Sequence, residues 1–418
     1  MAQTNPLPNT LDALLPELRD VYRDIHSHPE LSMQEQRTAN IAATSLQRAG
    51  YAVTAGIGGT GVVGVLANGD GPTVMLRADM DALPVEEATG LPYASTATAT
   101  DPDGNTVPVM HACGHDMHVT WLIGATALLA RARENWSGTV LAVFQPAEET
   151  AQGARAMIDD GLFDRFPKPH VVFGQHVMPG PAGEIRYRAG TTQAAADSLE
   201  IRLFGRGGHG SMPESTVDPV VMAAASVMRL QTIVSREVAA NQAAVVTIGA
   251  LQAGTKDNVI PDDALLRVNV RSFDEGVRRR VLDAIRRIVT AEAEASGAPK
   301  PPQITTTEHY PLTTNDPAAT ARVAAALRAR FGDEHVHELA APVPASEDFG
   351  SFGTEWGVPS VFWYVGGTDP DRYRRAEQAG RVADDIPTNH NPAFAPVIDP
   401  TLATGVQAVT AAALDAFS

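Results

Sequence analysis

The pattern of strands and helices changes near residue 194 and changes back near residue 311, and this order constrains the fold more than any other feature. On either side, short apolar runs typical of strands alternate with helical segments, which predicts an α/β domain. Between the two points the chain is expected to form β-α-β-β-α-β, the ferredoxin-like arrangement of a small α+β domain. The simplest account is one α/β domain made from residues 1–193 and 311–418, with residues 194–310 inserted as a second domain.

Local patterns place the elements of the α/β domain. Apolar residues at helical spacing predict a first helix over 11–25. Ser32 followed by Glu35 has the spacing of a capping box, which predicts a second helix that ends near Gly50. A third helix is expected from about 117 to 133. The apolar runs expected to form strands are 62–67, 73–81, 139–149 and 359–367.

Composition restricts the class of protein. The 418 residues include 32 basic and 49 acidic ones, a net charge of −17 that is spread along the chain. This balance disfavours binding to nucleic acid or to an anionic membrane, which both need a basic surface. A single cysteine excludes an intramolecular disulfide, and no signal peptide or long apolar segment is visible. We therefore expect a soluble, cytoplasmic protein.

Two glycine-rich segments fit the dinucleotide-binding pattern G-x-G-x-x-G but lack its context. GIGGTG (56–61) leads into an expected strand instead of a helix, so no helix N-terminus can face a pyrophosphate. GRGGHG (205–210) is followed by Pro213 and by the pair Asp218-Pro219, which delay the next helix. The chain also lacks a P-loop, a G-x-S-x-G elbow and an H-E-x-x-H motif. These classes of enzyme are therefore not supported.

Potential metal ligands gather at a few places in the sequence. A lone cysteine is usually a buried apolar residue, but Cys113 stands two residues before His115, and thiolate and imidazole are preferred zinc ligands. Glu148 and Glu149 follow an apolar strand, where one carboxylate can coordinate a metal while the other transfers protons. Two further histidines and two aspartates lie at the ends of apolar runs or in a loop: His176, His390, Asp79 and Asp81. Together these residues indicate a dinuclear hydrolase.

Several segments resemble, in order along nearly the whole chain, the M20 metallopeptidases, and within them the amidohydrolase branch of aminoacylases, hippurate hydrolases and auxin-conjugate hydrolases. They are HSHPELSMQE (26–35), RADMDALPVEE (77–87), MHACGHDMH (110–118), QPAEE (145–149), GGHGSMPE (207–214), KDNVIPD (256–262), SEDFG (346–350) and NHNPAF (389–394). The resemblance implies a zinc-peptidase-like α/β catalytic domain with an inserted lid that also forms a homodimer.

The resemblance also assigns roles to residues. It implies two divalent metal ions, with zinc expected and cobalt or manganese as alternatives. The implied metal ligands are Cys113, His115, Glu149, His176 and His390. Glu148 is the implied general base, His209 the implied lid residue that holds the oxyanion, and Asp79 and Asp81 lie behind the metal ions. Asn258 and Arg271 are candidates for binding the substrate carboxylate, although Arg271 could equally be a structural ion-pair partner.

The expected reaction is hydrolysis of the amide bond of N-acyl amino acids by a metal-bound water that Glu148 activates. Relatives usually carry Ala after the lid histidine and His after the following proline, where this chain has Gly210-Ser211 and Glu214. Relatives also show a Gly-Thr pair before the arginine of LRVNVRS (266–272), and these departures concern substrate preference. One alternative is a dipeptidase, or a deacylase of a biosynthetic intermediate, with the same metal centre. A second alternative is a catalytically inactive binding protein of the same fold.

Overall fold

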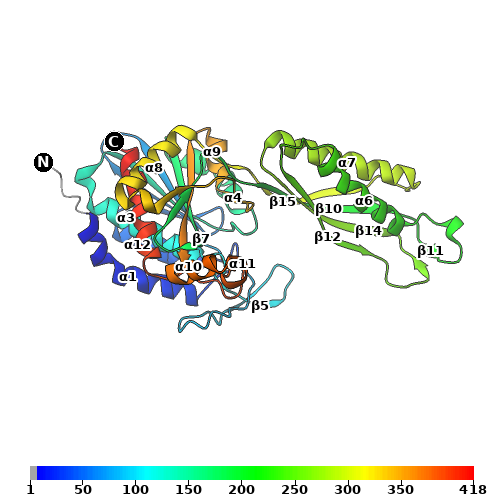
Figure 1. Ribbon diagram of the computed structural model, residues 1–418, viewed down its shortest axis with the longest axis horizontal. Helices are drawn as coiled ribbons and strands as arrows, with labels where there is room; N and C mark the ends of the chain where they lie inside the picture. The colour runs from blue at the N-terminus through cyan, green and yellow to red at the C-terminus, as the bar shows by residue number, and fades with distance from the viewer. Residues whose placement is uncertain (1–6) are drawn as a thin grey trace. The chain divides into compact units, whose positions relative to one another are not determined.

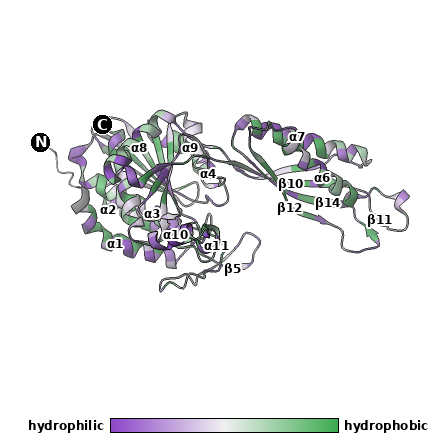
Figure 2. Cartoon of the chain, in the orientation of Figure 1, coloured by the Kyte–Doolittle hydropathy of each residue, from purple (hydrophilic) through white to green (hydrophobic). Residues whose placement is uncertain are grey.

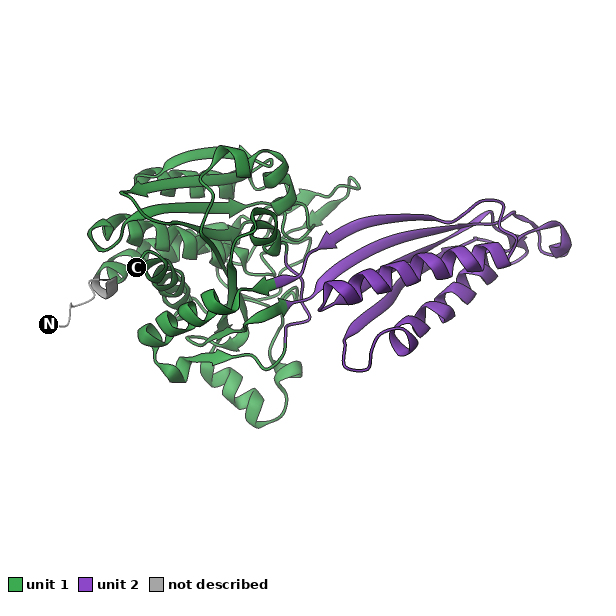
Figure 3. Cartoon of the chain, turned by 90° about the horizontal axis from the view of Figure 1, so that it is seen from above, with its two compact units in different colours: residues 1–192, 314–341, 348–418 green, residues 193–313, 342–347 purple. Residues whose placement is uncertain are grey.

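The computed structural model describes residues 7–418, with side chains from residue 10 onward. The chain divides into two compact units (Figure 3). Unit 1 comprises residues through 192, 314–341 and 348–418, and unit 2 comprises residues 193–313 and 342–347. The roles of these units as catalytic domain and as lid stay predictions. No helix in the described part of the chain is long and apolar enough to cross a membrane.

Unit 1 is built on a mixed sheet of eight strands (Figure 1). Their order is β1 (Ala52–Ile57), β2 (Gly61–Asn68), β6 (Gly138–Gln145), β3 (Thr73–Asp79), β7 (Val171–Pro181), β18 (Ser360–Thr368), β8 (Ile185–Tyr187) and β17 (Val336–Glu338). The central strands β6, β3, β7 and β18 run parallel, so their carboxyl ends lie at one edge. Every residue of β3 is buried, as expected of a strand covered on both faces. The predicted α/β fold class is confirmed.

Helices from both ends of the chain cover this sheet. They include α1 (Leu7–Ser27), α2 (Gln36–Arg48), α3 (His115–Arg131), α4 (Gly153–Asp159), α5 (Leu162–Arg165), α8 (Pro317–Phe331), α9 (Gly350–Trp356), α10 (Pro370–Gln378), α11 (Val382–Asp385) and α12 (Thr401–Ala416). Helix α3 is buried on nearly all sides and packs against α1, α2 and α12. A Cβ atom on Gly405 would lie 2.1 Å from the Trp121 ring, so glycine permits the close approach of α12 to α3.

Two local predictions need correction. Helix α3 begins at His115 instead of near 117, because Gly114 turns the chain in the left-handed conformation (φ 83°) directly before it. The capping box is also wrong. Helix α2 starts at Gln36, after Glu35, and the side chain of Glu35 makes no capping bond to it. The carboxylate of Glu30 accepts the first-turn amides of Arg37 and Thr38 instead. The side chain of Ser32 bonds instead to Asp81, and that of Glu35 accepts the amides of Met33 and Ala147.

Unit 2 contains, in chain order, β10 (Ala195–Phe204), α6 (Pro219–Arg236), β12 (Ala244–Ala253), β14 (Asp263–Ser272), α7 (Glu275–Ala295) and β15 (Gln303–Tyr310). The strands form an antiparallel sheet in the order β12-β14-β10-β15. Helix α7 carries both apolar and polar residues along its length (Figure 2), and its apolar residues pack with those of α6 against the sheet. A short ribbon, β11 (Gly208–His209) with β13 (Val259–Ile260), completes the unit.

Candidate metal centre

The candidate site residues of unit 1 come from the parallel strands and the segments that follow them, from the start of α3, and, for His390, from the loop between α11 and α12. Asp79 ends β3, and Glu148 and Glu149 follow β6. Gly114, between Cys113 and His115, has the left-handed conformation and lies close to β7. A Cβ atom on Gly114 would lie 2.4 Å from a methyl group of Val177. The ends of β3 and β6 and the start of α3 thus bring their acidic and histidine side chains together.

All five candidate metal ligands lie close together. One group of ligand atoms, from Cys113, His115 and His176, lies within 4.8 Å, and so does a second group from Cys113, Glu149 and His390. The thiol of Cys113 belongs to both groups. This arrangement offers two neighbouring ligand sets that share one sulfur atom, as a dinuclear centre would require.

The histidine rings present the same nitrogen to this cluster. Nδ1 of His176 donates to the Val177 carbonyl at 2.7 Å, so its Nε2 carries a lone pair, and that atom lies 3.4 Å from Cys113 Sγ. Nδ1 of His115 lies 3.2 Å from an oxygen of Asp81. Metal-binding histidines commonly bond the second nitrogen to a carbonyl or carboxylate, which fixes the tautomer. Both rings therefore have the orientation that metal ligation needs.

Two buried polar atoms in the cluster test whether a cation fits. His115 Nε2 and Glu149 Oε1 are buried and make no hydrogen bond in the described chain. The two atoms lie 3.9 Å apart, and Glu149 Oε1 lies 3.3 Å from His390 Nε2, a contact without hydrogen-bond geometry. Unpaired buried groups of this kind are costly unless another partner satisfies them. A divalent cation would satisfy them, so the donor set fits a metal centre.

The electrostatic surroundings also favour a cation. Burial, then the charges of Glu149 and Glu148, raise the pKa of the Cys113 thiol well above its usual value. Burial opposes protonation of His115, but Asp79 and Asp81 outweigh it and raise the pKa of this histidine to about 10. A divalent cation would counter both shifts, because it favours the thiolate and the neutral imidazole.

Two supporting residues were not predicted from the sequence. His118 Nδ1 lies 2.6 Å from Asp79, and its Nε2 accepts the Val177 amide at 2.8 Å, so both ring nitrogens are engaged. Arg77 donates to the other oxygen of Asp79 at 2.7 Å. His118 therefore supports Asp79 and is not a metal ligand. The spacing of His118 from His115, three residues along a helix, could have revealed that both face the same side.

The candidate residues of unit 2 form their own groups. The ribbon β11–β13 places His209 beside Asn258, whose carbonyl accepts the Gly210 amide at 2.9 Å. The backbone amide of Ser211 donates to His209 Nδ1 at 3.1 Å, so the proton of a neutral His209 ring lies on Nε2. A donor at Nε2 is what an oxyanion would need, although the role of His209 stays a prediction.

Arg271 in β14 donates to the Pro344 carbonyl at 2.8 Å and to the Ser346 hydroxyl at 3.2 Å. It has no carboxylate partner among the described residues, so a structural ion pair is not observed. The role of Arg271 in binding a substrate carboxylate stays a prediction.

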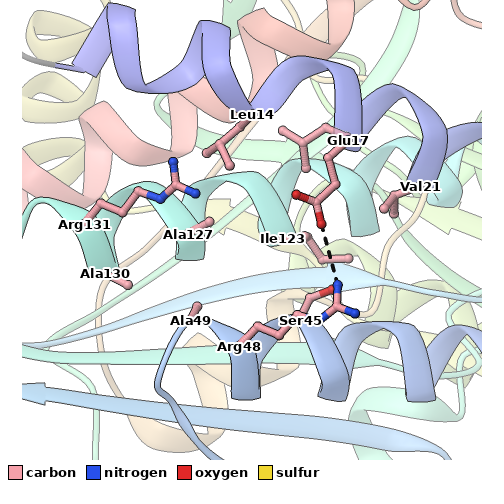
Figure 4. Close-up of a pocket in the computed structure, with 11 residues that line it drawn as sticks. Leu14, Glu17, Val21, Ser45, Arg48, Ala49, Ile123, Ala127, Ala130 and Arg131 are labelled. Atoms are coloured by element: carbon pink, nitrogen blue, oxygen red, sulfur yellow. Dashed lines mark ion pairs between the residues drawn. The ribbon is translucent and has the colours of Figure 1, made fainter.

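A separate groove of about 380 Å³ lies between α1, α2 and α3 (Figure 4). Apolar side chains line most of it, and Glu17 and Arg48 form an ion pair of 3.6 Å at its rim. None of the candidate site residues lines this groove, so we do not assign it to the metal centre.

Comparisons with known proteins agree with this chemistry. The family description "Peptidase family M20/M25/M40" matches residues 75–414. The hippurate hydrolase of Campylobacter jejuni is 41% identical over 83% of this chain and 88% of its own length. The N-acetylcysteine deacetylase of Bacillus subtilis is 36% identical over 84% of this chain and 88% of its own length. A solved structure from Bacillus subtilis, described as a dinuclear metal-binding peptidase of the M20 family, has a TM-score of 0.77 and 31% identity, and the match covers 97% of this chain and 99% of that one.

Proposed function

Since the chain belongs to the M20 peptidase family, in its amidohydrolase branch, we propose that it hydrolyses the amide bond of N-acyl amino acids with two divalent metal ions, zinc foremost. Membership of this family identifies the chain as a hydrolase, so the alternative of a catalytically inactive binding protein is not supported. The observation that carries the proposal is the convergence of ligand atoms of His115, His176 and Glu149 on Cys113. The relatives named for hippurate and N-acetylcysteine support the substrate class.

The proposed roles follow from the contacts of each residue. Cys113, His115, Glu149, His176 and His390 would hold the ions, which when bound act as Lewis acids that polarise the amide carbonyl and make water more acidic. The ligand atoms of Glu148, Glu149 and His115 lie within 4.8 Å of one another.

Glu148 can therefore take a proton from the attacking water and return it to the nitrogen of the leaving amine. Asp81 holds the His115 ring and Asp79 holds His118, and both remain behind the ligands. In unit 2, His209 would donate from Nε2 to the developing oxyanion, while Asn258 and Arg271 would bind the carboxylate of the substrate.

A panel of substrates tests this proposal. Acetyl and benzoyl derivatives of several amino acids are compared with unblocked dipeptides, using the metal-loaded enzyme. We expect the enzyme to release the free amino acid from the acyl derivatives, with a kcat/KM higher than its kcat/KM for the dipeptides. Glu148→Gln is the control that excludes a contaminating hydrolase, because it should lose this activity. Preferential cleavage of dipeptides would instead favour the dipeptidase alternative.

We also propose that the enzyme is a homodimer formed through unit 2. All the exposed large hydrophobic side chains of the described chain belong to this unit: Met212, Val220, Val221, Met228, Val234, Val245, Leu251 and Val259. Strand β12 is the edge of its sheet, and α6 packs beside it. An unpaired edge strand next to exposed apolar residues is typical of a surface that pairs with a second chain.

Sedimentation tests the dimer. We expect wild-type enzyme to sediment as a dimer and the double variant V221D/M228D to sediment as a monomer, because those side chains are 64% and 73% exposed. A variant that reverses a charge at an exposed position of α7, Arg279→Asp, is the matched control and should remain dimeric. A monomeric wild-type enzyme with full activity would contradict the proposal.

A further inference from the structure

The adjacent carboxylates of Glu148 and Glu149 converge on one place. Neighbouring side chains of a regular strand point to opposite faces, yet the ligand atoms of both glutamates lie within 4.8 Å of His115 and of one another. The chain leaves the strand geometry just before them, because Ala147 has the left-handed conformation, with φ of 49°. This conformation is unfavourable for a residue with a Cβ atom and persists only where the surroundings hold it.

The carboxylate of Glu35 holds this turn. Its Oε1 accepts the amide of Ala147 at 2.9 Å and the amide of Met33 at 2.9 Å. Met33 also has a positive φ, of 64°. Oε2 accepts the hydroxyl of Thr60, which lies between β1 and β2. Glu35 is fully buried, so one carboxylate binds the amides of two strained residues and joins three separate segments.

A second contact fixes the other end of the turn. The amide of Glu149 donates to Asp81 at 3.0 Å, and Asp81 also accepts the Ser32 hydroxyl at 2.6 Å. Ser32 and Glu35 therefore reach the same short turn from one segment before α2. No helix-capping bond accounts for either side chain.

We propose that Glu35 is a positioning residue for catalysis, which holds Ala147 in the left-handed conformation so that Glu148 and Glu149 face the same centre in different roles. The inference rests on the proposed function in assigning the base to Glu148. Glu35 itself makes no hydrogen bond to a candidate metal ligand in the described chain. It acts through the backbone of the turn.

The variant Glu35→Gln weakens this support with little change of volume. The amide oxygen of glutamine is a weaker acceptor than a carboxylate oxygen, and the NH2 group cannot accept the Thr60 hydroxyl. We expect kcat to fall about 10–100-fold, because small displacements of catalytic groups have effects of this size. KM should change by less than about threefold, as expected when ground-state binding is kept. Both metal ions should be retained, as checked by elemental analysis.

A rescue separates positioning from general damage. Glycine adopts positive φ without the cost that Ala147 bears, so the double variant E35Q/A147G needs less help to form the turn. We expect its kcat to exceed that of E35Q by about tenfold. A double variant as slow as E35Q would overturn the proposal.

The matched control is Glu30→Gln. Glu30 lies in the same segment and accepts the amides of Arg37 and Thr38, both at 2.9 Å, but it makes no bond to the turn. This variant should lose stability and keep its kcat. If E35Q does not fold, Thr60→Val replaces it, since it removes only the hydroxyl bond to Glu35, and it should show the same pattern with a smaller loss of kcat.

Hydrogen exchange gives a readout that does not depend on the substrate. Exchange of the segment 146–153 should be faster in E35Q than in wild type and unchanged in E30Q. If wild type cleaves no N-acyl amino acid, the proposed function fails, while the exchange data still decide whether Glu35 holds the turn. Unchanged exchange in E35Q, or a kcat within about twofold of wild type, would overturn the inference.

Discussion

His26 provides a prediction about stability that can be worked out from the structure. Its ring is fully buried, with Nδ1 2.6 Å from Asp116 and Nε2 3.1 Å from Glu87. The rings of Tyr22 and Tyr93 pack around it. Both nitrogens can donate to a carboxylate only when the ring is protonated. The imidazolium therefore joins α1 to Asp116 at the start of α3. Asp116 directly follows the candidate ligand His115 in the sequence.

The sign of the pH dependence follows from the pKa of His26. Burial opposes the charged ring, but hydrogen bonds to Asp116 and then to Glu87 outweigh it, and the pKa rises from 6.5 to about 9. The folded state therefore binds this proton more tightly than the unfolded state. The stabilisation is complete below pH 6.5 and is lost as the pH rises through 9. A shift of this size corresponds to about 3 kcal/mol in the free energy of unfolding.

The assay compares wild type with His26→Gln, in the same metal state, by urea denaturation at several pH values. All four tryptophans, Trp121, Trp136, Trp356 and Trp363, lie in unit 1, so their fluorescence reports the unit that contains His26.

Wild type should be more stable than His26→Gln below pH 6.5. This difference in unfolding free energy should shrink by about 3 kcal/mol as the pH is raised above 9. Other groups that titrate in this range, such as Glu35 with a pKa of about 7, are common to both proteins and cancel. A difference that stays constant with pH would refute the reasoning.

Three further predictions concern the metal centre. A chelator should abolish hydrolysis, and zinc, cobalt or manganese should restore it; full activity in protein shown by elemental analysis to be metal-free would contradict the proposal. Glu148→Gln should keep both ions and lower kcat by about 10²–10⁴-fold, whereas Cys113→Ala should lose metal, which elemental analysis of the purified variants decides. Gly114→Ala should destabilise the fold by about 2 kcal/mol or more in urea denaturation, because its φ is 83° and its Cβ would meet Val177 at 2.4 Å; Gly104→Ala, with φ of 86° and no neighbour within 4 Å, is the matched control and should cost less.

Patterns that depend on neighbouring residues predicted the structure well. The order of elements in unit 2 and the apolar runs of β3 and β6 agree with the expected strands and helices, because periodicity reflects burial directly. The segments with Cys113 and Glu149 also indicated a metal centre, since these residue types are rare together outside such sites. Their function as ligands is a proposal that the geometry supports.

Features that depend on distant partners could not be predicted. The spacing of Ser32 and Glu35 fits a helix cap. Only the fold shows that Ser32 bonds to Asp81 and that Glu35 accepts the amide of Ala147. His118 is similar. Its neighbour His115 has one nitrogen available to a metal, while both nitrogens of His118 are taken by Asp79 and a backbone amide. Sequence identifies the residue type, and the second contact of each ring decides its role.

Backbone strain connects these observations. The non-glycine residues with positive φ in the described chain are Met33, Ala147, Ala151 and His390. Met33 and Ala147 donate to Glu35, and the amide of Ala151 closes the turn on the Glu148 carbonyl at 2.9 Å. The amide of His390, a candidate ligand, donates to the Ala112 carbonyl at 2.8 Å, next to Cys113.

Ala147, Ala151 and His390 therefore belong to segments that carry candidate site residues, Met33 is joined to one of them through Glu35, and a hydrogen bond holds the amide of each. Such conformations cost about 1–3 kcal/mol each, and a fold keeps them only if the rest of its packing is stable enough. The buried helix α3 and the fully buried strand β3 supply that packing directly behind the site. It follows that substitutions which weaken the packing of α3 should disturb the candidate metal centre before they unfold unit 1. The strained turns should open locally at a lower free energy than the whole unit.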